Sequence, residues 1–585
     1  MTTSPSIFSA IQKLRALLTR EEKLKWIGIS GFALCSSLLE VITASVIVIF
    51  AQVLNDPLVG QKYFAKLGIT AEISPQRTIF YIALTFGAIY LIKNIIAAAE
   101  IFYQNFAIQK MNYEFKSRLL NKYAEMDYGF YLTRNSSFGT VTVSGDAEHA
   151  FSNGMLSIAV ILSESVVFFC LVGVIVYMNP SLALFVFTIG GILTFLMIKL
   201  VFPLFYNWGQ KMQGANIKAQ EHLYQFFHAF KEIILLRKKE IFVNSYYKYS
   251  KEKSRIQAAQ MAFNALPRIT IEILFVGLFV GTISFLCMSH ENSLQMLGIA
   301  GGYLYVGFRL MPGLNKMIGF LNMFKAAIPN IERVYEEYHM DTLKENYEEI
   351  PQFQFKKSIT LKDVDFRYIN TEKDALSKIN LEIKKGECIG IVGETGSGKS
   401  TLINLILGLL KPYHGTIVID GQYPANSYQW HTKIGYVPQS IYLTDDTIEA
   451  NIAFGEKPEK IDQKRLMKVI EDSQLGALIA QLPNGPKTIV GERGIRLSGG
   501  ERQRIAIARA LYRDPEVLIF DEATSSLDTA TEARLMETIH SVIKDRTVIM
   551  IAHRLSTLKD CDRVVEVEQC SISDVAKAKK MEKNV

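Results

Sequence analysis

The chain has 585 residues, of which 49% are hydrophobic, and a formal net charge of +7. This length excludes a single small domain, and the mean hydropathy of +0.16 favours a protein with part of its mass in a membrane. The basic excess does not predict nucleic-acid binding, because many of the Lys and Arg residues flank apolar runs, as the positive-inside rule expects of membrane proteins. Six cysteines without a CxxC pair indicate neither a disulfide framework nor a zinc site, which fits a reducing compartment.

Residues 1–25 predict an amphipathic helix that lies on a membrane surface. Apolar side chains recur at helical spacing from Ile7 to Leu18, with Lys13 and Arg15 between them. A helix packed in a soluble core is the alternative that this pattern leaves open. No signal peptide is predicted, because the first apolar run begins only near Trp26 and is far too long for a signal-peptide core.

Residues 26–340 predict a membrane domain with six transmembrane helices. Each of six apolar stretches is long enough to cross ~30 Å of hydrocarbon at ~1.5 Å per residue. These stretches lie near 26–54, 77–105, 152–178, 181–206, 262–288 and 295–324.

The connections between these stretches differ in length and charge. Asn179-Pro180 and roughly 289–294 are short, whereas 106–151 and 207–261 are long and rich in Lys and Arg. The positive-inside rule places both long connections in the cytoplasm, together with both termini of the chain. We expect these connections to prolong the helices into the cytoplasm.

The tips of the long connections, near 144–148 and 230–237, are the expected contacts with a second domain. A motor attached to a membrane domain needs a mechanical contact, although plain solvated connectors fit the same composition. Residues 341–358 are polar and charged and predict a linker. Alternating residues begin a strand at 359, so residues 359–585 are predicted to form the second domain.

The sequence from 389 to 410 predicts a phosphate-binding loop between a strand and a helix. Backbone N–H groups of such a loop wrap the phosphates of a nucleotide, Lys399 reaches the β- and γ-phosphates, and Ser400 ligates Mg²⁺. A flexible glycine loop is the alternative for this motif taken alone. The expected nucleotide-binding residues of the loop are Gly393, Glu394, Thr395, Gly396, Ser397, Gly398, Lys399, Ser400 and Thr401.

Polar side chains follow three further apolar runs and supply candidate catalytic groups. We expect Asp521 to hold Mg²⁺ and Glu522 to accept a proton from the water that attacks the γ-phosphate. Gln439 is expected to bridge Mg²⁺ or that water, and His553 to contact the γ-phosphate. A surface glutamine, a structural histidine and a simple acidic turn are the alternatives for these residues taken one at a time.

A second helix N-terminus follows the sequence Leu497-Ser498-Gly499-Gly500-Glu501. Ser498 and the N–H groups of Gly499 and Gly500 form an anion site there. The chain thus has two phosphate-binding helix ends and one P-loop lysine. This imbalance predicts a partner chain.

Six short motifs in a fixed order resemble the nucleotide-binding domain of ATP-binding cassette transporters. They are GETGSGKST at 393–401, VPQ at 437–439, LSGGE at 497–501, VLIFDE at 517–522, SSLD at 525–528 and AHR at 552–554. The resemblance implies an export-type half-transporter, with a polytopic α-helical membrane domain followed by an α/β P-loop nucleotide-binding domain. It also implies that Tyr368 stacks on adenine, for which packing on its own sheet is the alternative, and that Asp528 belongs to the nucleotide site.

In that family two cassettes dimerise head to tail, and each ATP lies between one chain's P-loop and the other chain's LSGG segment. ATP and Mg²⁺ are therefore the implied cofactors. A homodimer is favoured, because Lys399, Glu522, His553 and the LSGG segment are all of the active type. Two features depart from the pattern: Glu501 stands where Gln is commoner, and 564–585 lacks the usual strand–Gly turn, which leaves the last strand pair open.

Pro267-Arg268 and Phe308–Pro312 with Lys316 resemble the membrane domain of bacterial flippases for lipid-linked oligosaccharides. This resemblance implies that an amphipathic, anionic lipid-linked substrate moves from the inner to the outer leaflet of a bacterial plasma membrane. An exporter of peptides or hydrophobic drugs is one alternative. A membrane-anchored ATPase that acts as a channel regulator or receptor is another.

Charged residues inside the predicted spans indicate a substrate site. Counted from the outer ends at ~1.5 Å per residue, Lys199 and four further cations lie ~24 Å or more down. A buried cation costs at least ~2.5 kcal/mol at mid-membrane, so we expect the four to line a cytoplasm-facing cavity that attracts a phosphate or pyrophosphate. They are Lys93, Arg268, Arg309 and Lys316. Pairing with acids at similar depth is the alternative, and those acids are Glu100, Glu164 and Glu272.

Overall fold

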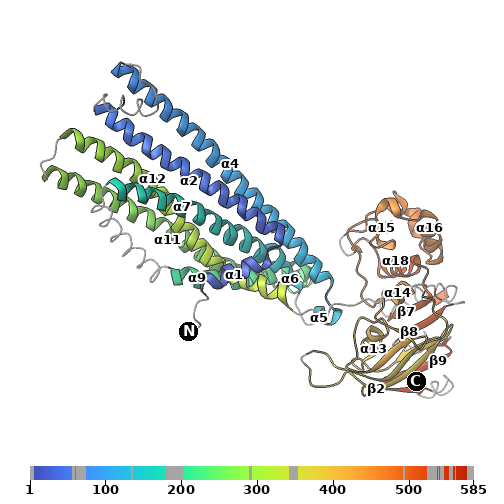
Figure 1. Ribbon diagram of the computed structural model, residues 1–585. Coiled ribbons are helices and arrows are strands. Elements are labelled where there is room, and N and C mark those ends of the chain that lie inside the picture. Colours follow the sequence, from blue (N-terminus) through green and yellow to red (C-terminus); the bar gives the residue numbers. More distant parts are fainter. Residues whose placement is uncertain are drawn as a thin grey trace. The chain divides into compact units, whose positions relative to one another are not determined.

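The computed structural model (Figure 1) describes residues 6–55, 60, 74–132, 136–178, 202–288, 293–340, 353–369, 371–491, 494–522, 536–537, 539, 546–552, 558–559 and 561–575. The chain divides into two compact units. The first contains Met1–Ala124 and Asn135–Asp341, and the second contains Glu125–Arg134 and Thr342–Val585. Most of the predicted linker lies outside the described residues, so the domain limits drawn from the sequence stay predictions.

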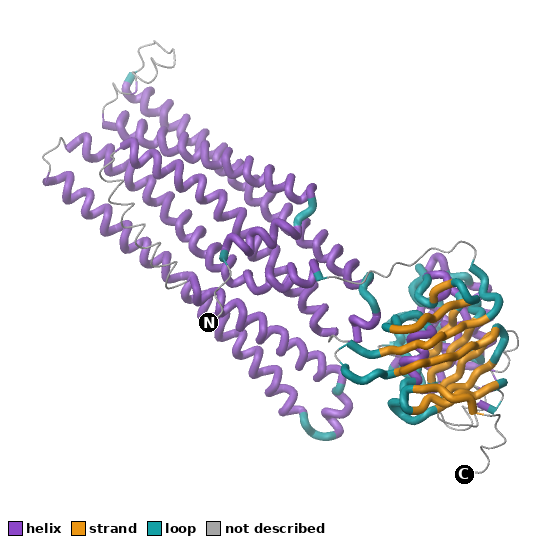
Figure 2. The backbone as a smooth tube through the Cα atoms, turned by 60° about the horizontal axis from the view of Figure 1, so that its bottom comes forward, coloured by secondary structure: helices purple, strands orange, loops and turns teal. Residues whose placement is uncertain are grey.

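The described part of the first unit is helical throughout. Its elements are α1 (Ile7–Leu17), α2 (Arg20–Asn55), α4 (Pro75–Ala124), α6 (Ser136–Val141), the π-helical η1 (Thr142–Asp146) and η2 (His149–Met155), α7 (Leu156–Met178), α9 (Phe202–His228), α10 (Phe230–Leu235), α11 (Lys239–Met288) and α12 (Ser293–His339). Figures 1 and 2 show the long helices α2, α4, α7, α11 and α12 running side by side.

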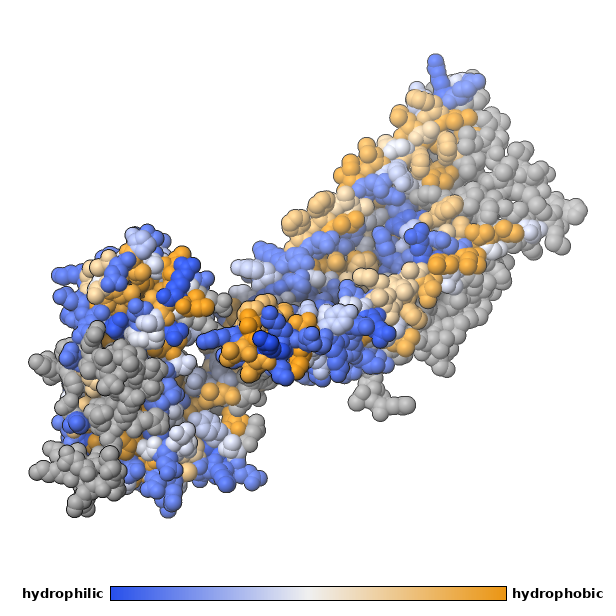
Figure 3. Space-filling model, turned by 180° about the vertical axis from the view of Figure 1, so that it is seen from behind, coloured by the Kyte–Doolittle hydropathy of each residue, from blue (hydrophilic) through white to orange (hydrophobic). Residues whose placement is uncertain are grey.

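Three helical segments within the described residues are long and apolar enough to cross a membrane. They are Arg20–Ile47, Gln76–Ala124 and Gly139–Gly173. They coincide with the first three predicted spans, and Figure 3 shows apolar side chains on the surface of this unit. The fourth predicted span, 181–206, lies almost wholly outside the described residues, and α11 and α12 include the fifth and sixth. The number of six spans therefore stays a prediction.

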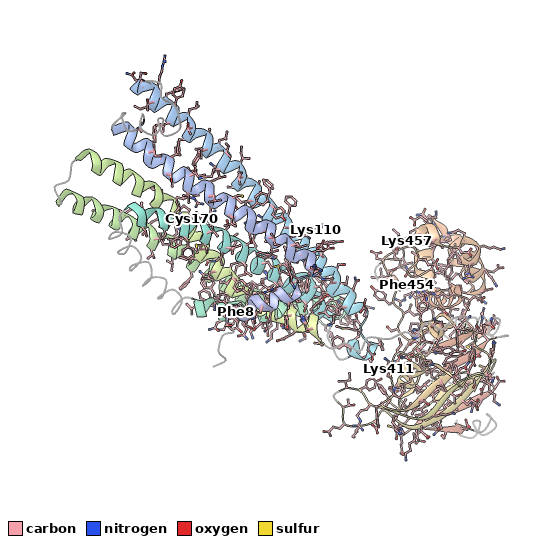
Figure 4. The ribbon with its side chains drawn as sticks, in the orientation of Figure 1. Phe8, Lys110, Cys170, Lys411, Phe454 and Lys457 are labelled. Atoms are coloured by element: carbon pink, nitrogen blue, oxygen red, sulfur yellow. The ribbon has the colours of Figure 1, made fainter. Side chains whose placement is uncertain are left out.

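The N-terminal helix α1 forms where the sequence predicts a helix, but its apolar face covers protein. Leu14 and Leu17 are buried in one cluster with Ile328 and Ile331 of α12. Phe8 (Figure 4) remains exposed on the other side. The alternative of a helix packed against other protein elements therefore describes the buried side of α1. That α1 lies at a membrane surface stays a prediction.

A buried ion pair fixes the corner between α1, α2 and α4. Thr19 and Glu22 form a capping box at the start of α2, in which the Thr19 N–H donates to the Glu22 carboxylate at 2.7 Å. Arg118 of α4 donates to both Glu22 oxygens, at 2.8 and 3.1 Å, and to the Leu17 carbonyl at 3.0 Å. One guanidinium thus satisfies a carboxylate and a helix-end carbonyl at the same time.

The predicted tip at 144–148 is wrong. Asp146 and Ala147 are buried in η1 and just after it, because the chain continues here as a packed helix. α4 ends earlier, at Ala124, and Glu125–Arg134, which includes α5 (Tyr128–Leu132), belongs to the second unit. At 230–237 the structure places the short helix α10 followed by a turn at Leu236 and Arg237, and the φ of Arg237 is +53°.

The second unit contains two sheets, drawn in orange in Figure 2. One has the order β2-β1-β4-β5 and the other the order β10-β9-β3-β8-β7-β6. The strands are β1 (Ser358–Phe366), β2 (Leu376–Lys384), β3 (Cys388–Val392), β4 (His414–Ile419), β5 (Tyr423–Pro424), β6 (Ile434–Val437), β7 (Val517–Asp521), β8 (Thr547–Ile551), β9 (Arg563–Glu568) and β10 (Ser571–Val575). The helices of eight residues or more are α13 (Lys399–Ile406), α16 (Gln463–Asp472) and α18 (Gly499–Tyr512). The shorter helices are α14 (Tyr428–Thr432), α15 (Ile448–Ile452), α17 (Gly476–Gln481), η3 (Pro458–Lys460) and η4 (Gly485–Lys487).

Alternating side chains of the six-stranded sheet enter two different cores. In β7, Leu518 and Phe520 pack in the cluster that contains α18. Val517 and Ile519 of the same strand pack in the cluster that contains α13. Both faces of the sheet are therefore covered. This agrees with the sequence, because successive side chains of a strand point to opposite faces and the parallel strands are continuous apolar runs.

The last strand pair forms although the sequence lacks a glycine at its turn. β9 and β10 pair antiparallel, with Glu568 opposite Ser571. The two turn residues, Gln569 and Cys570, have φ values of +46° and +64°. Positive φ at both central residues matches a type I′ hairpin turn, for which glycine is preferred and not obligatory.

Candidate active site

Four parallel strands bring the predicted catalytic residues to one edge of the six-stranded sheet. β3, β8, β7 and β6 are neighbours in this order, and Ile551 of β8 lies opposite both Ile391 and Asp521. The P-loop follows β3, Asp521 ends β7, and Gln439 comes two residues after β6. Carboxyl ends of parallel strands form the ligand-binding edge of such sheets.

The glycines of the P-loop are required by its backbone. Gly393, Gly396 and Gly398 have φ values of +148°, +86° and +109°. A Cβ atom at Gly393 would lie 2.3 Å from the Val567 carbonyl oxygen. Only glycine allows this close approach, and the resulting loop holds successive N–H groups in the concave arrangement that binds anions.

The residues of the loop fit a nucleotide phosphate. The Lys399 side chain is buried and donates to the carbonyl oxygens of Gly393 and Glu394, both at 2.8 Å, so its ammonium is held across the loop. The Ser397 hydroxyl is buried without a hydrogen-bond partner among the described residues. A bound phosphate supplies acceptors for both groups. Ser400 is the second residue of α13 and is exposed.

Asp521 is a buried carboxylate beside the P-loop lysine. Tyr436 donates to it at 3.2 Å. Burial raises the pKa of Asp521 and the neighbouring Glu522 charge adds to this, while the Tyr436 hydrogen bond and the Lys399 charge oppose it. A divalent cation offsets the cost of a buried carboxylate, so Asp521 and Ser400 fit the Mg²⁺ site that the sequence predicts.

Glu522 is held in a strained conformation next to Gln439. Its φ is +50°, which costs a non-glycine residue on the order of 1–3 kcal/mol. Its N–H donates to the Ile551 carbonyl at 3.1 Å, and the Gln439 amide donates to its carboxylate. The structure therefore brings together the predicted base and the predicted water-positioning residue.

The helix start that the sequence predicts at Ser498 is also formed, while anion binding there stays a prediction. The Ser498 hydroxyl accepts the Glu501 N–H at 3.3 Å, and the Glu501 carboxylate accepts the Ser498 N–H at 2.7 Å. This capping box fixes the start of α18 and gives Glu501 a clear role as the side chain that closes the box. Gly499 has open space around its Cα, so its backbone is accessible to a ligand.

Tyr368 follows β1 and touches the P-loop helix. Its hydroxyl lies 2.9 Å from Thr401 Oγ1, and its ring makes an edge contact with Phe366, with 5.0 Å between the ring centroids. The contact with Phe366 fits the sheet-packing alternative, and stacking on adenine stays a prediction. His553 and Asp528 lie outside the described residues, so their roles stay predictions as well.

Sequence reasoning missed a polar cluster that joins α18 to the segment after Gln439. Arg509 donates to the Asn451 carbonyl at 2.8 Å, to the Asn451 side chain at 3.1 Å and to the Tyr442 carbonyl at 3.0 Å. Its guanidinium also lies 4.7 Å from the ring centroid of Phe454 (Figure 4). Asn451 is fully buried. The available signal in the sequence was an Asn four residues after Thr447, which caps α15. Such a signal does not identify Arg509 as the partner of Asn451.

The first unit contains a partly open cavity of about 330 Å³, and three of the four predicted substrate-binding cations line it. Lys93 lies 3.1 Å and Arg309 2.8 Å from the Glu40 carboxylate. Lys316 lies 3.1 Å and Arg309 3.6 Å from the Glu164 carboxylate. The sequence therefore places these cations correctly together, and the alternative of pairing with nearby acids holds as well. Glu40, the lone acid in the first predicted span, was missed.

Arg268 does not line this cavity. It is exposed on α11 and pairs with Glu272 one helical turn away, at 2.8 Å. Counting residues from the end of a span gives a depth, but it does not show which side of the helix a residue occupies. The prediction that all four cations share one cavity is therefore wrong for Arg268.

Comparisons with known families agree with both units. The family model described as ABC transporter matches residues 376–525, and the model described as ABC transporter transmembrane region matches residues 30–300. A solved bacterial Atm1-family ABC exporter with ATP bound has the same fold, with a TM-score of 0.73 and 23% sequence identity over 92% of this chain and 94% of that chain.

Curated relatives are similar over different shares of their length. An ATP-dependent lipid A-core flippase from Cupriavidus metallidurans is 39% identical, but the match spans only 38% of each chain. A protein of the same name from Mannheimia succiniciproducens is 27% identical over 78% of each chain. A toxin RTX-I translocation ATP-binding protein from Actinobacillus pleuropneumoniae is 42% identical over 39% of this chain and 32% of its own.

Replacing Glu522 with Gln tests the proposed base. The change keeps the shape and the Gln439 contact but removes the proton acceptor, so ATP hydrolysis should fall by ~100-fold or more while ATP binding is retained. Glu516→Gln is the control, because Glu516 pairs with Lys433 at 2.9 Å at the other end of the same strand. Turnover of Glu522→Gln within a few-fold of the control would remove Glu522 from this role.

Proposed function

Since the chain belongs to the ATP-binding cassette transporters of the export type, we propose that it hydrolyses ATP to move an amphipathic, lipid-linked or lipid substrate across the bilayer. Transport runs from the inner to the outer leaflet of a bacterial plasma membrane. Both termini and the nucleotide-binding domain are cytoplasmic in this proposal. The observation that carries it is a charged cavity among apolar helices in a chain that also has a complete P-loop.

The residues at the sheet edge support ATP hydrolysis. Lys399 and the P-loop N–H groups bind the phosphates, while Ser400, Asp521 and Gln439 hold Mg²⁺, which neutralises charge on the phosphates when bound. Glu522 accepts the proton of the attacking water, which Gln439 helps to orient.

Two copies of the chain complete two ATP sites. The P-loop supplies one helix N-terminus and Ser498 begins another, and these lie on α13 and α18, which pack on opposite faces of one sheet. A single nucleotide cannot reach both ends across the sheet. We therefore place each ATP between the P-loop of one copy and the Ser498 segment of the other.

The cavity favours a lipid over the competing substrates. Its lining combines the six charged residues with apolar side chains of α4, α7 and α12. The polar part suits a headgroup, and the apolar part suits the acyl chains attached to it. Two flippase relatives match over 78% and 83% of this chain, whereas the toxin translocation relative matches over 39% of it, as short a share as other flippase relatives match. Export of peptides or drugs is the second candidate.

Mixed dimers test the shared sites. A Lys399→Ala chain and a Ser498→Arg chain carry different tags and are purified together, so that one composite site holds both lesions and the other is intact. We expect such dimers to hydrolyse ATP at about half the wild-type rate per dimer, whereas each homodimer is inactive. Inactive mixed dimers that assemble normally would contradict this arrangement.

Two arginine variants, one inside the cavity and one outside it, test whether the cavity binds the substrate. Arg309→Gln removes the cation that contacts both Glu40 and Glu164, so lipid transport and lipid-stimulated ATPase should fall by about tenfold, the scale of a lost charged hydrogen bond. Arg268→Gln is the matched control outside the cavity and should stay within about twofold of wild type, as expected for an exposed ion pair. Equal effects of the two variants would move the substrate site elsewhere.

A further inference from the structure

We propose that this cavity selects lipids whose headgroup carries both a phosphate and a primary amine. The phosphate binds beside Arg309 and Lys316, and the ammonium binds beside Glu100. The inference rests on the proposed function and adds the chemical class of the substrate to it.

Five of the six charged residues of the cavity form one connected group. Arg309 contacts both Glu40 and Glu164, while Lys93 adds to the first carboxylate and Lys316 to the second. Three cations and two carboxylates leave one formal positive charge. A phosphate fits beside the cations of such a group.

Glu100 is the sixth charged residue and has different neighbours. It is 5% exposed and accepts hydrogen bonds from the hydroxyls of Ser36 and Ser163 and, at 2.9 Å, from the amide of Gln104. These three donors are neutral. Within the described residues Glu100 takes part in no ion pair. It therefore carries a formal negative charge that hydrogen bonds orient but no cation balances.

The two groups share one wall of the cavity. Ser163, which donates to Glu100, directly precedes Glu164 on α7, and all of these side chains line the same cavity. A positive group and a negative group thus lie close together in an apolar helical unit. Charges in such a setting are stabilised by partners of opposite sign.

The net formal charge of the six residues favours a headgroup with an amine over one without it. The six residues sum to zero formal charge, so an anionic headgroup without an amine adds an uncompensated charge to an apolar unit. A headgroup with one phosphate and one ammonium adds no net charge and places each of its charges beside the opposite one. Glu100 accepts three of the about four hydrogen bonds that a carboxylate can accept, so one position remains for an N–H donor of an ammonium.

The wild-type protein in proteoliposomes gives the first test. Translocation is measured for phosphatidylethanolamine with a fluorescent acyl chain and for its N-acetylated form, which keeps the phosphate and chains but loses the ammonium. We expect the amine-bearing lipid to move about tenfold faster, the scale of one charge-assisted hydrogen bond. Phosphatidylglycerol should behave like the N-acetylated lipid.

Variants of Glu100 assign the preference to this residue. Glu100→Gln keeps the shape but removes the charge, so the rate ratio of the two lipids should fall to about one, whereas Glu100→Asp should keep a ratio above one. Glu114→Gln is the control on the same helix, because Glu114 pairs with Lys25 and Lys110 and does not line the cavity. It should leave the ratio unchanged. If Glu100→Gln does not assemble, the wild-type ratio decides.

The outcomes separate this inference from the proposed function. Equal wild-type rates for the two lipids would overturn the amine requirement and leave the lipid exporter standing. A preference that survives in Glu100→Gln would also overturn it, since the amine would then be recognised elsewhere. If no lipid moves while ATP is hydrolysed, the proposed function fails together with the inference.

Discussion

The parallel pairing of β3, β8, β7 and β6 is the constraint on which the candidate active site depends. Parallel strands end at the same edge, so residues more than one hundred positions apart in sequence, such as Lys399 and Asp521, are brought together without any loop having to reach across the unit. Burial of both faces makes this order costly to change, because a shift of one residue would exchange the two cores. The chemistry at the edge is therefore as well fixed as the core below it.

In the helical unit the main constraint is different, because charged side chains have to be stabilised among apolar helices. Arg309 links Glu40 and Glu164, and these carboxylates in turn pair with Lys93 and Lys316. Removing Arg309 leaves the two pairs Lys93–Glu40 and Lys316–Glu164, whereas removing either carboxylate leaves a cation without its partner, which is costly. The same residues line the cavity, so under the proposed function their charges can also bind a charged headgroup.

The sequence predicted those features that a short stretch of backbone determines. The P-loop could be located because its positive φ angles admit little besides glycine, and the Ser498 helix start because a capping box has a fixed spacing. The strained φ of Glu522 could not be predicted, since it follows from how β7 ends against β8. Arg268 was misplaced because depth in a span says nothing about helix face. The turn at Gln569 and Cys570 escaped prediction because tertiary pairing of β9 and β10 overrides a preference for glycine.

The central claim is that ATP hydrolysis at the sheet edge drives lipid movement through the helical unit. The direct measurement is the rate at which a fluorescent lipid crosses the bilayer of proteoliposomes that contain the wild-type protein, followed together with phosphate release. The account predicts translocation with ATP and Mg²⁺, and none with a non-hydrolysable ATP analogue or when Mg²⁺ is chelated. Lipid movement at the same rate with the analogue, or phosphate release without any lipid movement, would contradict it.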